Sequence, residues 1–225
     1  MSIKLGIISD IHANLPAFQE VLCMLDSCDK ILIAGDLVGY GPRPNEVIEM
    51  VKSKKFEVIA GNHDSACVTR NVSNFSAYAA EALLWTADHL TMENLEYLNE
   101  LPRRKRFQFE GVNILMVHGS PEDDDEYICE DDITEGYLKK ADCEVLIVGH
   151  SHIQWTVKIG DKLALNPGSV GQPRDRIPDA SYAFLTLPEK KVEQKRVKYD
   201  IDLTARMIVK ARLPRILADR LYIGY

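Results

Sequence analysis

The stretch LGIISDIH, residues 5–12, joins an unbroken apolar run to Asp10 and His12. A run this short, rich in isoleucine and without alternation, predicts a strand that is covered on both faces. Four later runs have the same character, and polar residues of the metal-binding type follow each one: Ile31–Ala34, Val58–Ala60, Val112–Val117 and Val145–Val148. The sequence therefore predicts five strands whose ends all carry chemically active side chains.

Helix-like segments separate the first three runs. Leu15–Leu25 has Pro16 in its first turn, and Asn45–Val51 follows Pro44, as is typical of helix starts. The order strand, helix, strand, helix, strand is the α/β pattern and predicts a parallel sheet in this half of the chain.

From Arg103 onward the pattern changes to short strands joined by turns such as Glu110-Gly111 and Gly160-Asp161. The expected strands are Phe107–Phe109, Val112–Val117, Trp155–Ile159, Leu163–Leu165, Tyr182–Leu187 and Val192–Lys198. This hairpin-like behaviour predicts an antiparallel or mixed sheet in the second half.

The chain has 225 residues, of which 46% are hydrophobic and 27% charged. These values exclude a disordered chain and a small disulfide-stapled one, and the length predicts one large domain over residues 1–225. The formal net charge of −7 opposes broad binding to nucleic acid or to an anionic membrane. We therefore expect no stable nucleic-acid binding.

The five cysteines have no CxxC spacing and are interpreted as reduced thiols. Residues 1–5 run directly into the first strand without the features of a signal peptide. No apolar run approaches the roughly 20 residues of a membrane span. The sequence thus predicts a cytoplasmic protein without a membrane segment.

Polar side chains follow the five predicted strands: Asp10 and His12, Asp36, Asn62 with His63 and Asp64, His118, and His150 with His152. In open α/β sheets ligands bind outside the carboxyl ends of the strands, so these groups can converge on one crevice. Carboxylates, imidazoles and a carboxamide without a thiolate suit manganese, iron, cobalt, nickel or zinc. The set is too large for one ion, and a carboxylate can bridge two.

Five of the six histidines follow predicted strands, whereas His89 lies in a helix-like stretch and is interpreted as structural. One histidine at a strand end is more often a buried, satisfied imidazole than a ligand. Five of them together with two aspartates and an asparagine favour a metal site.

At this point the sequence resembles a known family. Its motifs, in order, are Asp10-x-His12, Gly35-Asp36, Gly61-Asn62-His63-Asp64, His118 and Gly149-His150-x-His152. They resemble the calcineurin-like metallophosphoesterases over residues 3–187. GYGP at 39–42, NPGS at 166–169 and GQPR at 171–174 are similar to a bacterial or archaeal phosphodiesterase-like branch. The resemblance implies a four-layer αββα sandwich of two mixed sheets flanked by helices, with a helical insertion near the active site.

The resemblance also implies two divalent metal ions, manganese being the first expectation and iron, zinc, nickel or cobalt the alternatives. In this assignment the ligands of one ion are Asp10, His12 and His152, and the ligands of the other are Asn62, His118 and His150. Asp36 is then the bridge between the two ions.

His63 lies outside both ligand sets in this assignment, as an acid or a phosphate contact. Asp64 either orients a neighbouring imidazole, which would make it part of the catalytic machinery, or caps the turn. The implied reaction is in-line attack on phosphorus by a hydroxide that bridges the metals. His63 then stabilises the added charge or protonates the leaving oxygen.

The substrate class follows from one departure from the family pattern. Protein phosphatases of the family carry an Asp-Arg pair three and four residues after the bridging aspartate, where this chain has Gly39 and Tyr40. The usual clamp for a monoester dianion is missing, which favours a small phosphodiester or nucleotide substrate. Tyr40 and Arg174 are the candidate substrate-binding residues.

Other readings remain open from the sequence alone. They are a phosphomonoesterase, including a protein phosphatase, and a non-catalytic metal-binding scaffold or nucleotide sensor.

Two further segments carry predictions. Residues 66–105 are longer than a parallel sheet requires and are expected to form a helical cap near the metals. Residues 200–225 are expected to form a C-terminal helical tail, with Asp200–Arg212 as its helix. Its apolar end, Leu221–Tyr225, either docks on the body or forms a self-association patch, so a homo-oligomer is also open.

Overall fold

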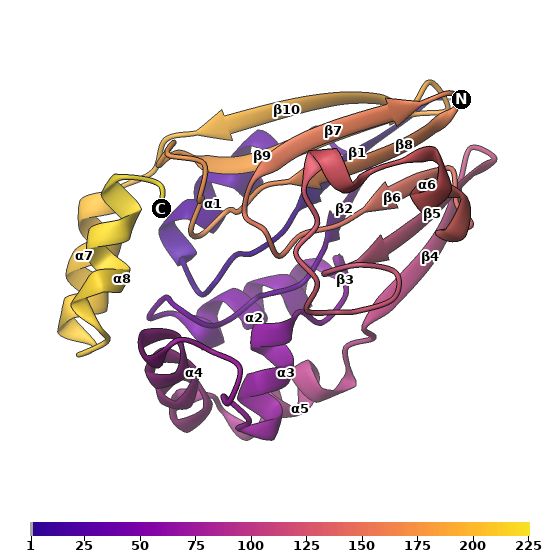
Figure 1. Cartoon of the computed structure of the whole chain (residues 1–225). Coiled ribbons are helices and arrows are strands. Elements are labelled where there is room, and N and C mark those ends of the chain that lie inside the picture. The colour runs from indigo at the N-terminus through magenta and orange to yellow at the C-terminus, as the bar shows by residue number, and fades with distance from the viewer. Residues whose placement is uncertain (1) are drawn as a thin grey trace.

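The computed structural model describes residues 2–225, and Figure 1 shows their course. The strands are β1 (Ile3–Ile8), β2 (Lys30–Ile33), β3 (Glu57–Val58), β4 (Arg104–Phe109), β5 (Val112–Val117), β6 (Val145–Ile147), β7 (Gln154–Ile159), β8 (Lys162–Pro167), β9 (Ala180–Leu187) and β10 (Lys191–Val197). The helices are α1 (Leu15–Met24), α2 (Pro44–Lys54), α3 (Asn62–Thr69), α4 (Ala77–His89), α5 (Met92–Glu100), α6 (Glu135–Lys140), α7 (Ile201–Lys210) and α8 (Arg215–Asp219), with short 3-10 turns at Glu130–Asp132 and Arg220–Tyr222.

The strands form two five-stranded sheets, with the orders β10-β9-β1-β2-β3 and β4-β5-β6-β8-β7. In the first sheet β1, β2 and β3 are parallel, as the βαβαβ pattern predicts, while β9 and β10 are antiparallel additions from the second half of the chain. In the second sheet β5, β6 and β8 are parallel, and β4 and β7 run antiparallel at the edges. Both sheets are therefore mixed.

Three apolar clusters hold the layers together. The first lies between the sheets and joins residues such as Leu5 and Leu185 of one sheet to Ile114 and Leu165 of the other. The second packs α1, α2 and α3 against the outer face of the first sheet. The third packs α6 and the loop before it against the outer face of the second sheet. The predicted four-layer αββα sandwich is confirmed, with a thin fourth layer.

Most element boundaries differ from the sequence prediction by a few residues, and two differences bear on the site. The third strand is only Glu57–Val58, because the Ala60 amide N–H donates to the Pro102 carbonyl rather than continuing the ladder with β2. The third motif was expected as a strand-end loop, but Asn62 is the first residue of α3. The helix places Asn62 and His63 at its N-terminus.

The segment 66–105 contains the end of α3, then α4 and α5, which is the helical content expected of it. The tail also forms a helix where one was expected, although α7 is shorter at both ends than Asp200–Arg212. Along residues 2–225 no helix is both long enough and apolar enough to cross a bilayer.

Candidate metal centre

The loops that follow β1 and β2 are hydrogen-bonded to each other, which brings two motifs side by side. The Asp10 amide donates to the Gly35 carbonyl, and the His12 amide donates to the Asp36 carbonyl, each at 3.0 Å. A third loop closes on the same place, because the Gly171 amide donates to the Asp10 carbonyl. Strand ends from distant parts of the chain thus meet at one edge.

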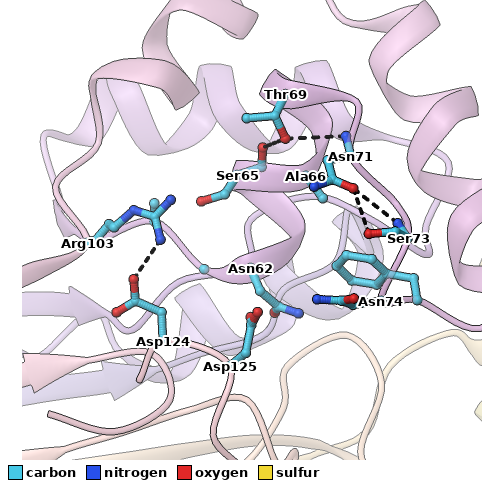
Figure 2. Close-up of a pocket in the computed structure, with 13 residues that line it drawn as sticks. Asn62, Ser65, Ala66, Thr69, Asn71, Ser73, Asn74, Arg103, Asp124 and Asp125 are labelled. Carbon is cyan, nitrogen blue, oxygen red and sulfur yellow. Dashed lines mark hydrogen bonds and ion pairs between the residues drawn. The ribbon is translucent and has the colours of Figure 1, made fainter. Parts of the chain in front are cut away.

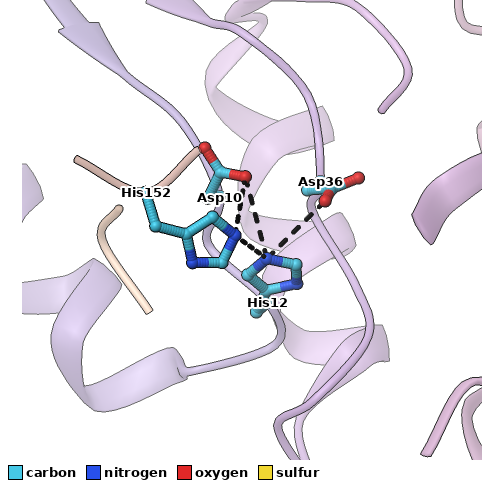
Figure 3. Close-up of side chains that lie close together, drawn as sticks. All are labelled: Asp10, His12, Asp36 and His152. Carbon is cyan, nitrogen blue, oxygen red and sulfur yellow. Dashed lines mark hydrogen bonds and ion pairs between the residues drawn. The ribbon is translucent and has the colours of Figure 1, made fainter. Parts of the chain in front are cut away.

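Four of the predicted ligands converge there. Asp10, His12, Asp36 and His152 are all buried, and each offers a ligand atom within 4.8 Å of the others. Figure 3 shows the carboxylates and imidazoles pointing toward one another from separate loops. His152 Nε2 lies 3.1 Å from His12 Nε2 and 3.2 Å from Asp10 Oδ1.

The backbone fixes which imidazole nitrogen faces inward. His12 Nδ1 is hydrogen-bonded to the Val38 carbonyl oxygen, and His152 Nδ1 is hydrogen-bonded to the Gln172 carbonyl oxygen. A carbonyl accepts only, so Nδ1 carries the proton and Nε2 presents its lone pair. Two lone pairs and carboxylate oxygens therefore face one another in a buried space.

A cation between these lone pairs and carboxylate oxygens would stabilise them. Asp10 Oδ1 and Asp36 Oδ2 are buried and have no hydrogen-bond partner among residues 2–225, which is costly unless something positive sits between them. Burial raises the pKa of each carboxyl, yet the imidazoles outweigh it. His152 holds the pKa of Asp10 below its ordinary value, and His118 does the same for Asp36. The donor set fits a divalent metal of the borderline class.

A second group of predicted ligands adjoins the first through Asp36. His118 Nε2 lies 3.2 Å from Asn62 Oδ1 and 3.3 Å from Asp36 Oδ2, while its Nδ1 faces the Ala34 carbonyl at 2.7 Å. Burial disfavours the charged form of His118, but Asp36 outweighs it and raises the pKa of the imidazole to about 10. The local field around His118 thus favours a cation, whether a proton or a metal ion.

His150 is placed differently from the other predicted ligands. Its amide donates to Asp10 Oδ2 at 3.2 Å, but its Nε2 lies 3.1 Å from the Asp125 carbonyl. The ring packs 4.1 Å from the ring of Tyr127 and 5.0 Å from that of His118. Burial lowers the pKa of His150 to about 4, so the ring is neutral. Its role as a ligand stays a prediction.

The predicted ligands share an unusual backbone. Asp10, His12, Asp36, His150 and His152 all have φ between +49° and +64°, the left-handed region that costs a non-glycine residue roughly 1–2 kcal/mol. Such strain persists only where the surroundings impose it, and it clusters at functional sites. Five strained residues at one strand-end cluster mark this edge as the functional one.

His63 and Asp64 take different positions at the start of α3. The His63 amide donates to Asp36 Oδ1 at 2.9 Å, and its Nδ1 is buried without a partner among residues 2–225. Asp64 accepts from the amides of Gly61 and Val38 at 3.0 and 3.1 Å, which are the contacts of the turn-capping alternative. Burial and the charge of Asp36 raise the pKa of Asp64 to about 7.

Tyr40 and Arg174 lie together at the mouth of the centre. Arg174 Nη2 donates to the Tyr40 hydroxyl at 3.0 Å, and Nη1 reaches the Tyr127 hydroxyl at 3.4 Å. Both residues line a cleft of about 390 Å³, with His63, Phe75 and Arg220 among its walls. We call this space the substrate cleft. It brings the two predicted substrate-binding residues next to the predicted acid.

A second, polar pocket of about 250 Å³ continues from Asn62 along α3 (Figure 2). Its walls include Ser65, Asn71 and Ser73, and Arg103 closes one side through an ion pair with Asp124 at 2.7 Å. Because Asn62 lines both spaces, the pocket provides room next to the metal centre for a hydrogen-bonding group.

Several residues of the site escape sequence reasoning. Tyr127 packs on His150, Phe75 lies 5.0 Å from the ring of His63, and Arg220 lines the substrate cleft from the tail. None of the three belongs to a motif with a metal-binding spacing. The only features of the sequence that drew attention to the segments of Phe75 and Arg220 were the length of the insertion and the apolar character of the tail.

The tail docks on the body, which is one of its two predicted alternatives. Leu213, Leu217 and Leu221 pack in one apolar cluster with Tyr40 and with Ala82 of α4. In Figure 1 the tail, in yellow, lies at the side of the molecule next to α4.

Gly39 offers a test of how tightly the site is packed. A Cβ there would lie 2.5 Å from His63 Nδ1 and 2.9 Å from His12 Nδ1, and its φ is +132°. We expect Gly39→Ala to lower the free energy of unfolding by about 1–3 kcal/mol through strain alone, and to lower phosphoester turnover because the His63 ring must move. Urea unfolding and an initial-rate assay measure the two effects.

The matched control is Gly160→Ala, in the β7–β8 turn. Its φ is +59° and nothing lies within 4 Å of the added Cβ, so it carries backbone strain without a clash. It should lose some stability and no activity. Equal behaviour of the two variants would contradict the contact assigned to Gly39.

Comparison with known proteins gives a consistent result. The family model of the calcineurin-like phosphoesterase superfamily domain matches residues 3–190, and its match ends before the tail. An uncharacterized protein of Methanocaldococcus jannaschii is 35% identical, with 98% of each chain covered. Phosphodiesterase YfcE of Escherichia coli K12 is 28% identical, with 81% of this chain and 86% of that protein covered.

Solved structures agree with the fold. The metallophosphoesterase of Sphaerobacter thermophilus superposes with a TM-score of 0.86 at 34% identity, covering all of both chains. A hypothetical protein of Pyrococcus horikoshii superposes with a TM-score of 0.90 at 25% identity, covering 99% of this chain and 98% of that one.

Proposed function

The chain belongs to the calcineurin-like phosphoesterase superfamily, a family of hydrolytic phosphoesterases, and we propose that it is a phosphodiesterase that works with two divalent metal ions. The proposed substrate is a small, nucleotide-type phosphodiester. One observation carries the proposal: buried carboxylate oxygens of Asp10 and Asp36 lack hydrogen-bond partners among residues 2–225 and face the Nε2 atoms of three imidazoles.

Asp10, His12 and His152 would hold one ion, Asn62 and His118 the other, and Asp36 would serve both. His150 would belong to the second set as well, provided that its Nε2 were released from the Asp125 carbonyl. When bound, the ions would supply Lewis acidity toward the phosphoryl oxygens and a water of lowered pKa. The donors, oxygen and imidazole nitrogen without a thiolate, suit manganese, iron, cobalt, nickel or zinc, and manganese is the first choice because the family resemblance implies it.

The chain's own residues orient the ester. Arg174 donates hydrogen bonds at the mouth of the substrate cleft, where a phosphoryl oxygen can replace a phenol oxygen as acceptor. His63 is positioned through its own amide by Asp36, and its unpartnered Nδ1 is available to the leaving oxygen. The polar pocket beside Asn62 would take the alcohol part of the ester.

A singly charged diester is favoured over a doubly charged monoester because one of the cations that bind the monoester dianion in the family's phosphatases is missing. Tyr40 stands where the family's phosphatases carry an arginine, and burial raises the pKa of its phenol to about 12, so it stays neutral.

The proposal also puts the reaction in the cytoplasm, because all five cysteines are free, as expected in a reducing compartment.

The basic run 103–106 gives no support to nucleic-acid binding. Arg103 pairs with Asp124, Lys105 pairs with Glu57, and Arg106 donates to main-chain carbonyls. The positive charges of this run are therefore engaged within the protein, in keeping with a small-molecule substrate.

The test is initial hydrolysis of bis-p-nitrophenyl phosphate and of p-nitrophenyl phosphate by chelator-stripped protein, with and without Mn²⁺. We expect diester turnover only with added metal, and a lower kcat/KM for the monoester. Preference for the monoester would replace the proposal with a phosphomonoesterase. Stoichiometric metal without turnover of either ester would favour a scaffold or a nucleotide sensor.

A further inference from the structure

The C-terminal tail places an arginine in the substrate cleft. Arg220 is only 8% exposed, and it lines the cleft together with His63, Tyr40 and Arg174. It begins the last 3-10 turn, directly after α8. The tail therefore contributes to the same space as the strand-end loops.

The position of Arg220 is well fixed. Its Nη1 donates to the Tyr78 hydroxyl at 3.1 Å, and its Nε donates to the main-chain oxygen of Tyr225. The guanidinium carbon lies 5.5 Å from the centre of the Tyr78 ring and 5.6 Å from that of Tyr225. Two aromatic faces and two oxygens hold the cation at the wall of the cleft.

The tail itself is anchored on both sides of the cleft. Its leucines pack with Tyr40 and α4, and the Gly224 carbonyl accepts from the Arg176 amide at 2.8 Å. Thr204 donates to Asn14 Oδ1, two residues beyond His12. Arg220 is thus positioned by contacts with the loops that carry the metal centre and Arg174.

Neither arginine of the cleft is neutralised by an acidic side chain. Within residues 2–225, no aspartate or glutamate lies within 4.0 Å of the guanidinium of Arg174 or Arg220, and both side chains are largely buried, unlike Arg43, Arg70, Arg103 and Arg215, which are more exposed and pair with a carboxylate. Donors also remain unused: Arg174 Nε is buried without a partner, and Arg220 Nη2 has no hydrogen bond in the same part of the chain. Two buried guanidinium groups beside one cleft, each with an unused N–H donor and without an aspartate or glutamate partner, favour an anionic ligand.

One phosphodiester brings a single negative charge, which Arg174 and the metal centre already meet. We propose that Arg220 binds a second phosphate group of the substrate, so that the tail selects phosphodiesters carrying a further phosphate over simple diesters. Guanidinium groups suit this role because their planar fork matches two phosphate oxygens. The inference rests on the proposed phosphodiesterase function and names the substrate class for that same site.

The experiment compares two pairs of probes that differ by one phosphate. Thymidine 5′-monophosphate and thymidine 3′,5′-bisphosphate are titrated into Mn²⁺-loaded protein by calorimetry. The p-nitrophenyl 5′-esters of the same two nucleotides report turnover. The variants are Arg220→Gln, Arg220→Lys and, as a control with the same change in charge, Arg206→Gln on the exposed face of α7.

For the wild type we expect tighter binding of the bisphosphate. Arg220→Gln should weaken bisphosphate binding about 10–100-fold, the value of hydrogen bonds to a charged group, and change monophosphate binding less than about twofold. Arg220→Lys should restore part of the loss, because it keeps the charge without the fork. Arg206→Gln should match the wild type.

Two results overturn the proposal. Equal losses for both nucleotides in Arg220→Gln, together with a lowered Tm, would give Arg220 a structural role only. No preference of the wild type for the bisphosphate would remove the second phosphate site. A protein that binds both nucleotides and hydrolyses neither ester would refute the proposed function instead, and the ratio of the two dissociation constants would still test Arg220.

Discussion

His63→Ala is expected to lower kcat for diester hydrolysis by about 10²–10⁴-fold, the usual contribution of general acid catalysis, while leaving the metal content unchanged. The reason is its position. The His63 side chain is buried beside the ring of His12, at 4.6 Å between centroids, but its Nδ1 has no partner among residues 2–225. Its contact with Asp36 runs through the main-chain amide, which alanine retains.

The measurements are steady-state kinetics and metal content by elemental analysis on the same preparations. His89→Ala is the control. The His89 ring stacks on Trp85 of α4 and is hydrogen-bonded to the Trp85 carbonyl, away from the cleft. The control should match the wild type in both measurements. A loss of metal in His63→Ala that parallels its loss of activity would make His63 a ligand instead.

Asp36→Asn is expected to remove most of the bound metal and to lower kcat/KM by more than about 100-fold, since changes to residues that merely support metal ligands already cost 10–100-fold. Asp36 Oδ1 accepts from the His63 amide, and Oδ2 lies 3.3 Å from His118 Nε2 and 3.6 Å from His12 Nε2. An asparagine keeps the first contact through its carbonyl oxygen. Its amide group would then face two imidazole nitrogens in place of a carboxylate oxygen.

Metal content and activity are measured across a range of Mn²⁺ concentrations, so that a weakened site is distinguished from a lost one. Asp88→Asn is the matched control, because Asp88 is an exposed aspartate on α4 whose one ion pair among residues 2–225 is with Arg70. Retention of full metal content by Asp36→Asn would show that Asp36 is not the shared ligand of the two groups.

The strands and the convergence of the ligands were predictable because both depend on local sequence. Apolar runs such as Ile31–Ala34 form strands wherever two faces are covered, and the residues after them meet at the edge of a parallel sheet. The prediction located the residues of the buried cluster of Asp10, His12, Asp36 and His152. The sequence could not predict how short β3 is, because the Ala60 amide donates to the carbonyl of Pro102, which is far away in sequence.

Tyr40, His63 and Arg174 were predicted from motifs, but three other walls of the substrate cleft, Phe75, Tyr127 and Arg220, were not predictable for the same physical reason. Arg220 reaches the cleft only because the leucines of the tail pack on α4 and Tyr40. Tyr127 packs on His150 from the acidic loop that follows β5. Such positions depend on packing between segments that are not neighbours in the chain, which a single sequence does not encode in any local pattern.

The place of β1 in its sheet has a consequence for how the protein is made. β1 is synthesised well before β9, yet it lies in the middle of its sheet, between β2 and β9. One edge of β1 stays open until residues 180–187 are synthesised, and an open edge is a template for pairing with another chain. The buried cluster is also completed late, because His152 is synthesised long after Asp10. The nascent chain therefore carries an open strand edge and an incomplete cluster until residues 152–187 are synthesised, and mispairing in that interval is the main risk to correct folding.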